Sequence, residues 1–256
     1  MKKTFIRMGI LLLIIYIGTG VFLYLQQRTF LYHPTQNIAS KYTNMVLENE
    51  EEKINIIILN EGHKNAILYF GGNAESMTAS SDYIAAQFPE FTVYLMDYRG
   101  YGASSGVATE KGLYSDALKL YDRAKEKHDH ISIGGRSLGT AIATYVAANR
   151  EVSKLALITP FDSIVNVAQG RYPMYPVALL LHDKYDSAAR AKDISAKTFI
   201  VIAQNDKVIS KERTQGLIDA FNSKLLQITT ITDRGHNDIS SDDRYYKIMQ
   251  DFIGEG

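Results

Sequence analysis

Apolar positions divide the chain into one long N-terminal run and a region in which short apolar runs alternate with helical patterns. The runs 45–47 and 54–59 predict two antiparallel strands at a sheet edge, and 66–70 predicts the first buried strand. Further strands are predicted at 91–96, 131–133, 155–158, 198–203 and 225–231, and helices at 74–88, 110–127, 211–221 and 242–252. Short apolar strands separated by helices are typical of an α/β fold with a mostly parallel sheet covered on both faces.

The N-terminal run contains twenty uncharged residues, 8–27, between Arg7 and Arg28. This is the length of apolar helix that crosses the hydrocarbon core of a membrane. A cleaved export signal is the alternative, because the small residues at 18–20 resemble a cleavage site, but the apolar run continues beyond them to Leu25. We expect residues 1–28 to form one transmembrane anchor, with secretion after signal cleavage as the alternative.

Charge and composition narrow the remaining possibilities. Basic residues are denser before the apolar run than after it, which favours a cytoplasmic N-terminus and an extracytoplasmic globular part. Residues 29–256 are enough for one α/β domain with a single sizeable core. The formal net charge is zero, so no basic surface for nucleic acid is expected. The chain has no cysteine, which excludes disulfides and a thiol nucleophile.

The most informative stretch runs from 131 to 148, where a β-branched run, a glycine pair, a serine and an alanine-rich run follow one another. Together they predict a strand, a sharp turn and a helix, with Ser137 on the turn. Such a turn strains the serine backbone and presses its neighbours against strand and helix, so only glycine fits at Gly135 and Gly139. The alternative is a serine in an ordinary glycine-rich strand-to-helix turn.

Two further polar side chains follow late strands of the predicted sheet. Asp206 comes after the strand 198–203, and His236 comes after the strand 225–231. Ligands of such sheets bind beyond the carboxyl ends of the strands. The chain order Ser137, Asp206, His236 is that of the α/β hydrolases. Asp162, which also follows a strand, is the alternative acid, although it is equally suited to cap a helix that begins near residue 163.

The glycines after the strand 66–70 provide a candidate anion-binding loop. Gly71 and Gly72 let the backbone approach a ligand closely, so we expect one oxyanion donor here and the other at the amide of Leu138. A phosphate-binding loop is the alternative, but the stretch lacks the lysine of a P-loop and the third glycine of a dinucleotide motif. His128-Asp129-His130 predicts a solvated turn rather than a metal site, because adjacent side chains before a strand point in opposing directions.

The chain resembles the membrane-anchored serine hydrolases of the α/β-hydrolase family, in the branch of monoacylglycerol lipases, lysophospholipases and acyl-protein thioesterases. The resemblance rests on Tyr32-His33-Pro34, Gly71-Gly72-Asn73, 97–104, Gly135-Arg136-Ser137-Leu138-Gly139, Thr159-Pro160-Phe161, Asp206 and Gly235-His236-Asn237-Asp238. It implies Ser137 as nucleophile, His236 as base and Asp206 as acid. It also implies an oxyanion hole formed by the backbone amides of Asn73 and Leu138.

The resemblance further implies a small-molecule substrate, a carboxylic ester or thioester of a lipid-like acyl group, and chemistry that uses no cofactor and no metal. There are two alternatives: the protein is a non-catalytic binding protein that kept the fold, or it is a serine peptidase. The oligomeric state is not predicted.

An insertion is predicted at about 160–197, which has no strand pattern and contains the uncharged stretch 172–181. Its place after the strand that follows the serine turn puts it over the mouth of the site as a short lid. Leaving this stretch in water would cost roughly 25 cal/mol for each Å² exposed. It therefore either packs onto the domain or lines an acyl-chain tunnel that faces the membrane, with Leu179 and Leu181 as lining residues.

Overall fold

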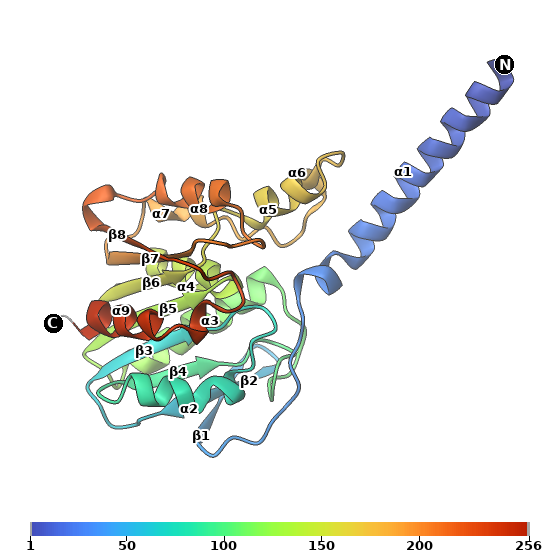
Figure 1. Ribbon diagram of the computed structural model, residues 1–256. Helices are drawn as coiled ribbons and strands as arrows, with labels where there is room; N and C mark the ends of the chain where they lie inside the picture. Colours follow the sequence, from blue (N-terminus) through green and yellow to red (C-terminus); the bar gives the residue numbers. More distant parts are fainter. Residues whose placement is uncertain (1, 255–256) are drawn as a thin grey trace.

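The computed structural model describes residues 2–254, which form an eight-stranded sheet, its covering helices and a protruding N-terminal helix (Figure 1). The strands are β1 (Thr43–Asn49), β2 (Glu52–Leu59), β3 (Asn65–Phe70), β4 (Thr92–Met96), β5 (His130–Arg136), β6 (Lys154–Ile158), β7 (Lys197–Ala203) and β8 (Leu226–Ile231). Their order in the sheet is β1-β2-β4-β3-β5-β6-β7-β8. Only the β1–β2 and β2–β4 pairs are antiparallel, so the predicted mostly parallel sheet is confirmed.

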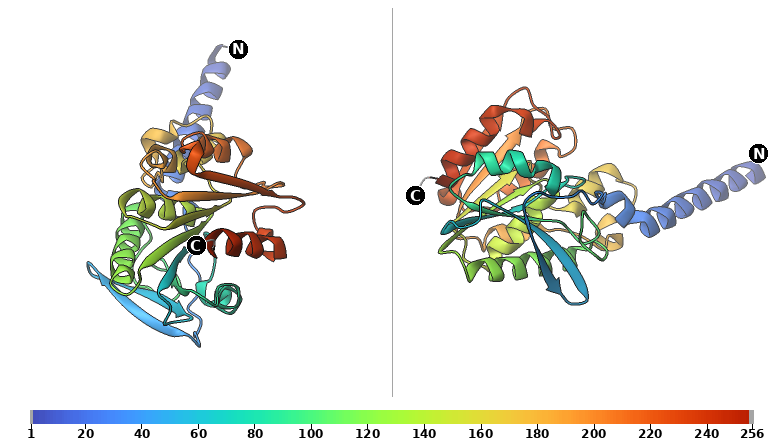
Figure 2. Two further views of the ribbon diagram at one scale, coloured as in Figure 1. Left: turned by 90° about the vertical axis from the view of Figure 1, so that its left-hand side faces the viewer. Right: turned by 90° about the horizontal axis from the view of Figure 1, so that it is seen from below.

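Helices cover both faces of this sheet (Figure 2). These helices are α2 (Met77–Gln87), α3 (Glu110–Lys125), α4 (Leu138–Asn149), α7 (Ser187–Ala191), α8 (Lys211–Ile218) and α9 (Asp243–Gly254). Two further helices, α5 (Ile164–Arg171) and α6 (Val177–Leu180), lie beyond the sheet on the side of α1. Successive residues of a strand point to opposite faces, and Ile56 and Ile57 accordingly belong to different apolar cores. One core packs against α3, α4, α7 and α8, and the other against α2 and α9.

Several elements differ in their bounds from the sequence prediction, and for two of them, α2 and β5, the structure shows a local reason. α2 begins at Met77 rather than at residue 74, because the hydroxyl of Ser76 accepts the amide of Ala79 and caps the helix there. β5 continues through its glycines to Arg136, because Gly135 pairs with Phe70 on one side and Arg136 with Ile158 on the other. The serine turn therefore begins directly at the end of a central strand.

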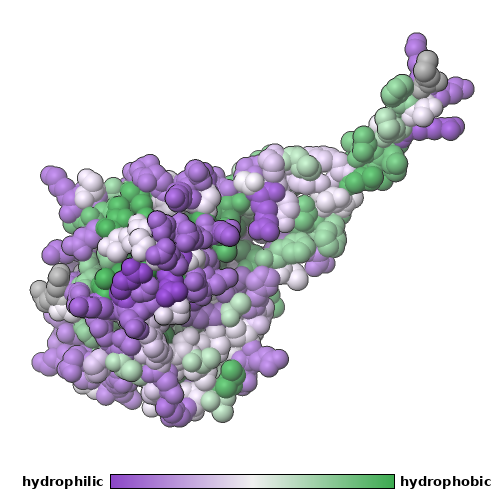
Figure 3. Space-filling view, viewed as in Figure 1, coloured by the Kyte–Doolittle hydropathy of each residue, from purple (hydrophilic) through white to green (hydrophobic). Residues whose placement is uncertain are grey.

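The N-terminal helix α1 (Lys2–Leu31) is long and apolar enough, by length and composition, to cross a membrane. It continues three residues beyond the expected boundary at residue 28. None of its described residues is buried, and Figure 3 shows hydrophobic surface along the helix down to the globular part. Extended backbone then leads from Leu31 to β1 at the far edge of the sheet (Figure 1).

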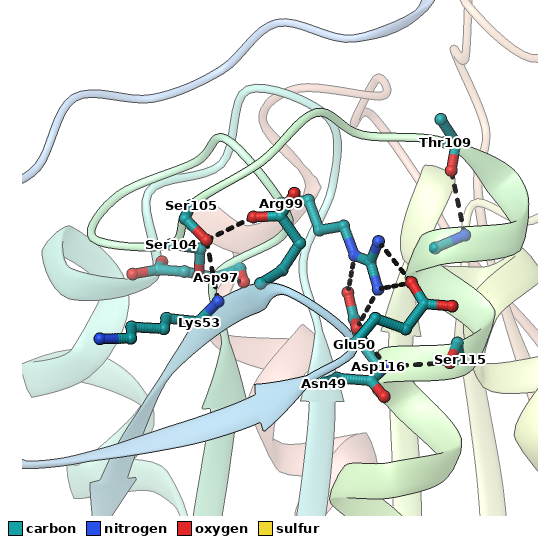
Figure 4. A network of polar contacts seen from close by, with 12 residues as sticks. Asn49, Glu50, Lys53, Asp97, Arg99, Ser104, Ser105, Thr109, Ser115 and Asp116 are labelled. Atoms are coloured by element: carbon teal, nitrogen blue, oxygen red, sulfur yellow. Dashed lines mark hydrogen bonds and ion pairs between the residues drawn. The ribbon is translucent and has the colours of Figure 1, made fainter.

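The stretch 97–104 holds the edge hairpin against α3 (Figure 4). The guanidinium of Arg99 donates through Nε and Nη2 to the two carboxylate oxygens of Asp116, at 2.8 and 2.9 Å. Glu50, in the turn between β1 and β2, accepts from the same guanidinium at 3.2 Å. The Asp116 side chain is fully buried, and Asn49 donates to it at 2.7 Å. These contacts place Arg99 in the framework of the sheet edge, whereas Tyr98 and Tyr101 of the same stretch donate their hydroxyls to the carbonyl of Gly71 and to the Oδ1 atom of Asn73, at 2.6 and 2.7 Å.

Replacing Asp116 with alanine is expected to lower the free energy of unfolding by about 3 to 5 kcal/mol, because the change leaves the buried guanidinium of Arg99 without its carboxylate. The matched control is Asp122→Ala on the same helix, which removes the exposed ion pair with Arg150 and should cost about 1 kcal/mol or less. Urea unfolding of the full chain in detergent measures both. Equal losses in the two variants would contradict a supporting role for Arg99.

Candidate active site

Ser137 lies on a strained turn between β5 and α4. Its backbone has φ 49° and ψ −116°, a conformation that L-residues rarely adopt. A Cβ added at Gly139 would lie 1.9 Å from the carbonyl oxygen of Phe70, and one added at Gly135 would lie 2.5 Å from the carbonyl oxygen of Gly139. Both glycines are therefore required by close backbone approach, as the sequence predicts.

The three residues expected to act together lie in one line of hydrogen bonds. The Nε2 atom of His236 is 2.8 Å from the hydroxyl oxygen of Ser137, and its Nδ1 atom is 2.8 Å from the Oδ2 atom of Asp206. The side chains of His236 and Asp206 are only 8% and 9% exposed. The three residues come from turns that follow β5, β7 and β8, at the carboxyl edge of the sheet.

The carboxylate of Asp206 is oriented by its own loop. Its Oδ1 atom accepts the backbone amides of Val208 and Ile209, both at 2.8 Å, which leaves Oδ2 for the imidazole. A backbone hydrogen bond of 2.9 Å from Asn205 to the carbonyl of Arg234 joins this loop to the loop that carries His236. Asp206 and His236 are thus held together by main-chain contacts as well as by their own hydrogen bond.

Asp162, the alternative acid, has other partners. Its Oδ2 atom accepts from the Arg213 guanidinium at 3.0 Å and from the Asn166 amide at 2.8 Å, while Oδ1 accepts the backbone amide of Ser163. The N-cap of α5 is Ser163 rather than Asp162. Asp162 therefore joins α5 to α8, and the imidazole of His236 is paired with Asp206 instead.

The glycine loop after β3 lies against the serine turn. A Cβ added at Gly72 would be 3.7 Å from the Cβ of Ser137. The side chain of Asn73 is fixed by the connector, since its Nδ2 donates to the carbonyl of Leu31 at 2.6 Å and its Oδ1 accepts the amide of His33 at 3.0 Å. Leu138 is the first residue of α4, so its amide has no acceptor within the helix.

Arg136 and Glu75 form part of the site although the sequence pattern did not single them out. The guanidinium of Arg136 donates to the carbonyl of His236 at 3.1 Å and to the Glu75 carboxylate at 3.4 Å. The same carboxylate accepts the amide of Gly72 at 2.7 Å. Arg136 thus connects the glycine loop to the histidine loop. The available signal was a charged residue, Arg136, beside Ser137 in a stretch, 131–148, that is otherwise uncharged.

The expectation of a solvated turn at His128 was wrong. His128 is buried, its Nε2 lies 2.8 Å from the hydroxyl of Tyr94, and its Nδ1 lies 2.9 Å from the carbonyl of His63. Burial lowers the pKa of this imidazole. A neutral imidazole satisfied on both sides suits a buried position, whereas His130 is exposed. In the part of the chain that the structure describes, no group of three or more His, Cys, Asp or Glu side chains is placed to hold a metal ion.

The insertion between β6 and β7 divides into two parts. Its second part packs into the domain, where Tyr185, Ala191 and Ile194 join the core. Its first part, α5 and α6 with their connections, lies on the side of the domain from which α1 emerges (Figure 1). Together with the C-terminal half of α1 it encloses an apolar groove. Leu181 lines this groove, but Leu179 is 85% exposed and is not part of the groove lining, so the expectation that Leu179 lines a tunnel was wrong. Leu180 takes that position.

Comparisons with known proteins agree with this fold. A sequence profile of the alpha/beta hydrolase fold matches residues 65–192. An uncharacterized protein of Mycobacterium tuberculosis is 30% identical over 182 residues, which cover 69% of this chain and 64% of that protein, so the match spans less than two thirds of it. The alpha/beta hydrolase domain-containing protein 17B of Homo sapiens is 26% identical over 198 residues, which cover 75% of this chain and 67% of that protein.

Two solved structures share the arrangement of strands and helices. An esterase of Pyrococcus furiosus superposes with a TM-score of 0.68 at 16% identity, covering 87% of this chain and 98% of the esterase. The enol-lactonase of Burkholderia xenovorans superposes with a TM-score of 0.65 at 17% identity, and the match covers 82% of this chain and 100% of the lactonase. Because the sequence profile covers half of the chain and the same fold recurs in both structures, the chain belongs to the alpha/beta hydrolase fold family.

Proposed function

We propose that this protein is a serine hydrolase that cleaves carboxylic ester or thioester bonds of lipid-like acyl groups. The observation that carries the proposal is the line of two 2.8 Å contacts from the hydroxyl of Ser137 through His236 to Asp206. A nucleophile, a base within hydrogen-bond reach and a third group that orients the base are the arrangement that activates a serine.

In the proposed reaction, the oxygen of Ser137 attacks the carbonyl carbon of the substrate while Nε2 of His236 takes the serine proton. Asp206 accepts the Nδ1–H of the imidazole, which keeps the Nε2 lone pair directed at the serine and stabilises the imidazolium that forms. The bond from the carbonyl carbon to the leaving oxygen or sulfur then breaks, and the imidazolium gives its proton to the leaving group. Water repeats the same steps on the acyl-serine and releases the acid.

The charge that develops on the carbonyl oxygen needs preorganised donors. We assign this role to the backbone amides of Asn73 and Leu138, each worth roughly 3 to 4 kcal/mol at comparable sites. The support for Asn73 is its fixed side chain and the proximity of its loop to Ser137, and the support for Leu138 is its place at the start of α4. Glu75 and Arg136 act as positioning residues for the two loops.

We assign the membrane as the second partner of the protein, through residues 1–28 as a transmembrane anchor and 29–256 as the hydrolase domain. The length and hydropathy of α1 support this assignment, and the basic residues before it favour a cytoplasmic N-terminus. The apolar groove beside α1 supports a lipid-like acyl substrate. An esterase and an enol-lactonase with this fold are consistent with ester-bond cleavage.

The test is activity-based labelling of the full chain in detergent with a fluorophosphonate, followed by mapping of the modified residue by mass spectrometry. We expect labelling at Ser137 in the folded protein and none in the heat-denatured control, since the probe reacts with an activated serine. A panel of p-nitrophenyl esters, an acyl thioester and a peptide p-nitroanilide then separates the substrate classes. Absence of both labelling and hydrolysis would favour a non-catalytic binding protein, and preferred cleavage of the anilide would favour a peptidase.

A further inference from the structure

In the middle of α1, one face of the helix contacts the insertion through a ring stack and hydrogen bonds. The ring of Tyr16 stacks on that of Tyr175 with 4.8 Å between their centres. Tyr16 donates its hydroxyl to the carbonyl of Met174 at 2.7 Å, and Tyr175 donates its own to the carbonyl of Tyr16 at 3.0 Å. A Cβ added at Gly20 would lie 2.9 Å from the Tyr175 ring, so this glycine lets the ring lie directly on the helix.

The same face continues toward the end of the helix. Gln27 accepts the backbone amide of His182 at 2.7 Å, and the imidazole of His182 lies 2.9 Å from the hydroxyl of Tyr24. Arg28 pairs with Asp183 at 2.9 Å. Positions 16, 20, 24 and 27 recur at the spacing of one helix face. A helix that only anchors a domain needs no such row of polar contacts to one segment of that domain, so α1 has a defined rotation against the insertion.

The groove enclosed by these two segments has a volume of about 480 Å³. Leu23 and Phe30 of α1 form part of one wall, and Val167, Leu180 and Leu181 of the insertion form part of the other. The volume lies within the range of roughly 300 to 1,000 Å³ that is usual for small-molecule sites. Its walls are mainly aliphatic and aromatic, which suits an apolar occupant.

The groove also borders the site described above. Leu31 and His33 line it, and both are hydrogen bonded through their backbone to the side chain of Asn73. Asn73 carries one of the proposed oxyanion donors. A molecule in the groove therefore lies next to the loop that would hold the carbonyl of a substrate.

We propose that this groove holds the acyl chain of the ester substrate and that α1 is a wall of the substrate site as well as an anchor. The inference rests on the proposed function. Because α1 is long and apolar enough to span a membrane, a chain that enters the groove between α1 and the insertion passes from lipid to protein with little contact with water. The helix then determines which chain lengths are accepted.

The test narrows the groove from the α1 side. The variant is Leu23→Trp in the full chain, reconstituted in lipid nanodiscs, and the measured quantity is the ratio of kcat/KM for p-nitrophenyl palmitate to kcat/KM for p-nitrophenyl acetate. We expect this ratio to fall by about tenfold or more, because each methylene of the acyl chain that is displaced from the groove is worth roughly fourfold in affinity. The matched control is Leu25→Trp, two residues along the same helix, 71% exposed and outside the groove lining. It should leave the ratio at its wild-type value.

A second pair of variants tests the wall of the groove that the insertion forms. This pair keeps the inference testable if Leu23→Trp does not fold. Leu180→Trp fills the groove from α6, whereas Leu179→Trp adds the same side chain to its exposed neighbour. Only the first should lower the palmitate-to-acetate ratio. If both groove variants are folded and keep the wild-type ratio, the groove does not hold the reacting chain, and any lipid in it is a structural one.

Labelling by fluorophosphonate in the same samples separates this inference from the proposed function. Wild-type protein that is neither labelled at Ser137 nor active on acetate would contradict the proposed function itself. Wild-type protein that is labelled and active, together with an unchanged ratio in the groove variants, would contradict only the assignment of the groove.

Discussion

Replacing Ser137 with alanine is expected to abolish fluorophosphonate labelling and to lower kcat by about a million-fold. The expected loss is this large because the proposed nucleophile, base and acid would act as one unit, so that removing the serine oxygen leaves His236 with no proton to take. The remaining catalysis comes from substrate binding and the oxyanion donors. Hydrolysis of a p-nitrophenyl ester by the full chain, with circular dichroism to confirm folding, measures the effect.

Ser104→Ala is the matched control for this change. The hydroxyl of Ser104 donates to the carbonyl of Asp97 and accepts the amide of Asn55, both at 2.8 Å, so it supports the loop after β4. Its loss should cost about 1 kcal/mol of stability and leave labelling intact. Labelling that persists in Ser137→Ala, at Ser104 or any other serine, would remove Ser137 from the mechanism.

Replacing Asp206 with asparagine is expected to lower kcat by about ten-thousand-fold. An asparagine amide facing Nδ1 of His236 can act as a donor there, which favours the imidazole tautomer that carries its proton on Nε2 and cannot accept the serine proton. The geometry is otherwise kept, because the backbone amides of Val208 and Ile209 can still bond to a side-chain oxygen at position 206. KM should change far less than kcat.

Asp162→Asn is the matched control, since Asp162 also follows a strand of the sheet and is also largely buried. This variant weakens the ion pair with Arg213 and should lower the unfolding midpoint more than it lowers kcat. A larger loss of kcat in Asp162→Asn than in Asp206→Asn would reverse the assignment of the acid.

Much of the framework was predictable because its signals are local. The buried strands β3, β6 and β7 are short apolar runs with turn residues at their ends, and each was found within a residue or two of its bounds. The requirement for glycine at positions 135 and 139 was equally predictable, since a serine turn of this kind brings strand and helix backbone into contact whatever the rest of the fold. The order Ser137, Asp206, His236 along the chain predicted which turns meet at the carboxyl edge.

Contacts between distant parts of the chain were decided by the tertiary structure. The sequence predicted a solvated turn at His128, because the burial of its imidazole depends on Tyr94 in the distant strand β4. The partners of Arg136, the Glu75 carboxylate and the carbonyl of His236, likewise come from loops that are distant in the sequence. The choice between Leu179 and Leu180 as a groove residue depended on the rotation of α6 against α1.

The sequence by itself determined the α/β class, the glycine-flanked serine turn and an apolar helix of membrane-spanning length, because each depends on neighbouring residues. The pairing of His236 with Asp206 and the packing of α1 on the insertion depend on how separate elements meet in space, which no local pattern encodes.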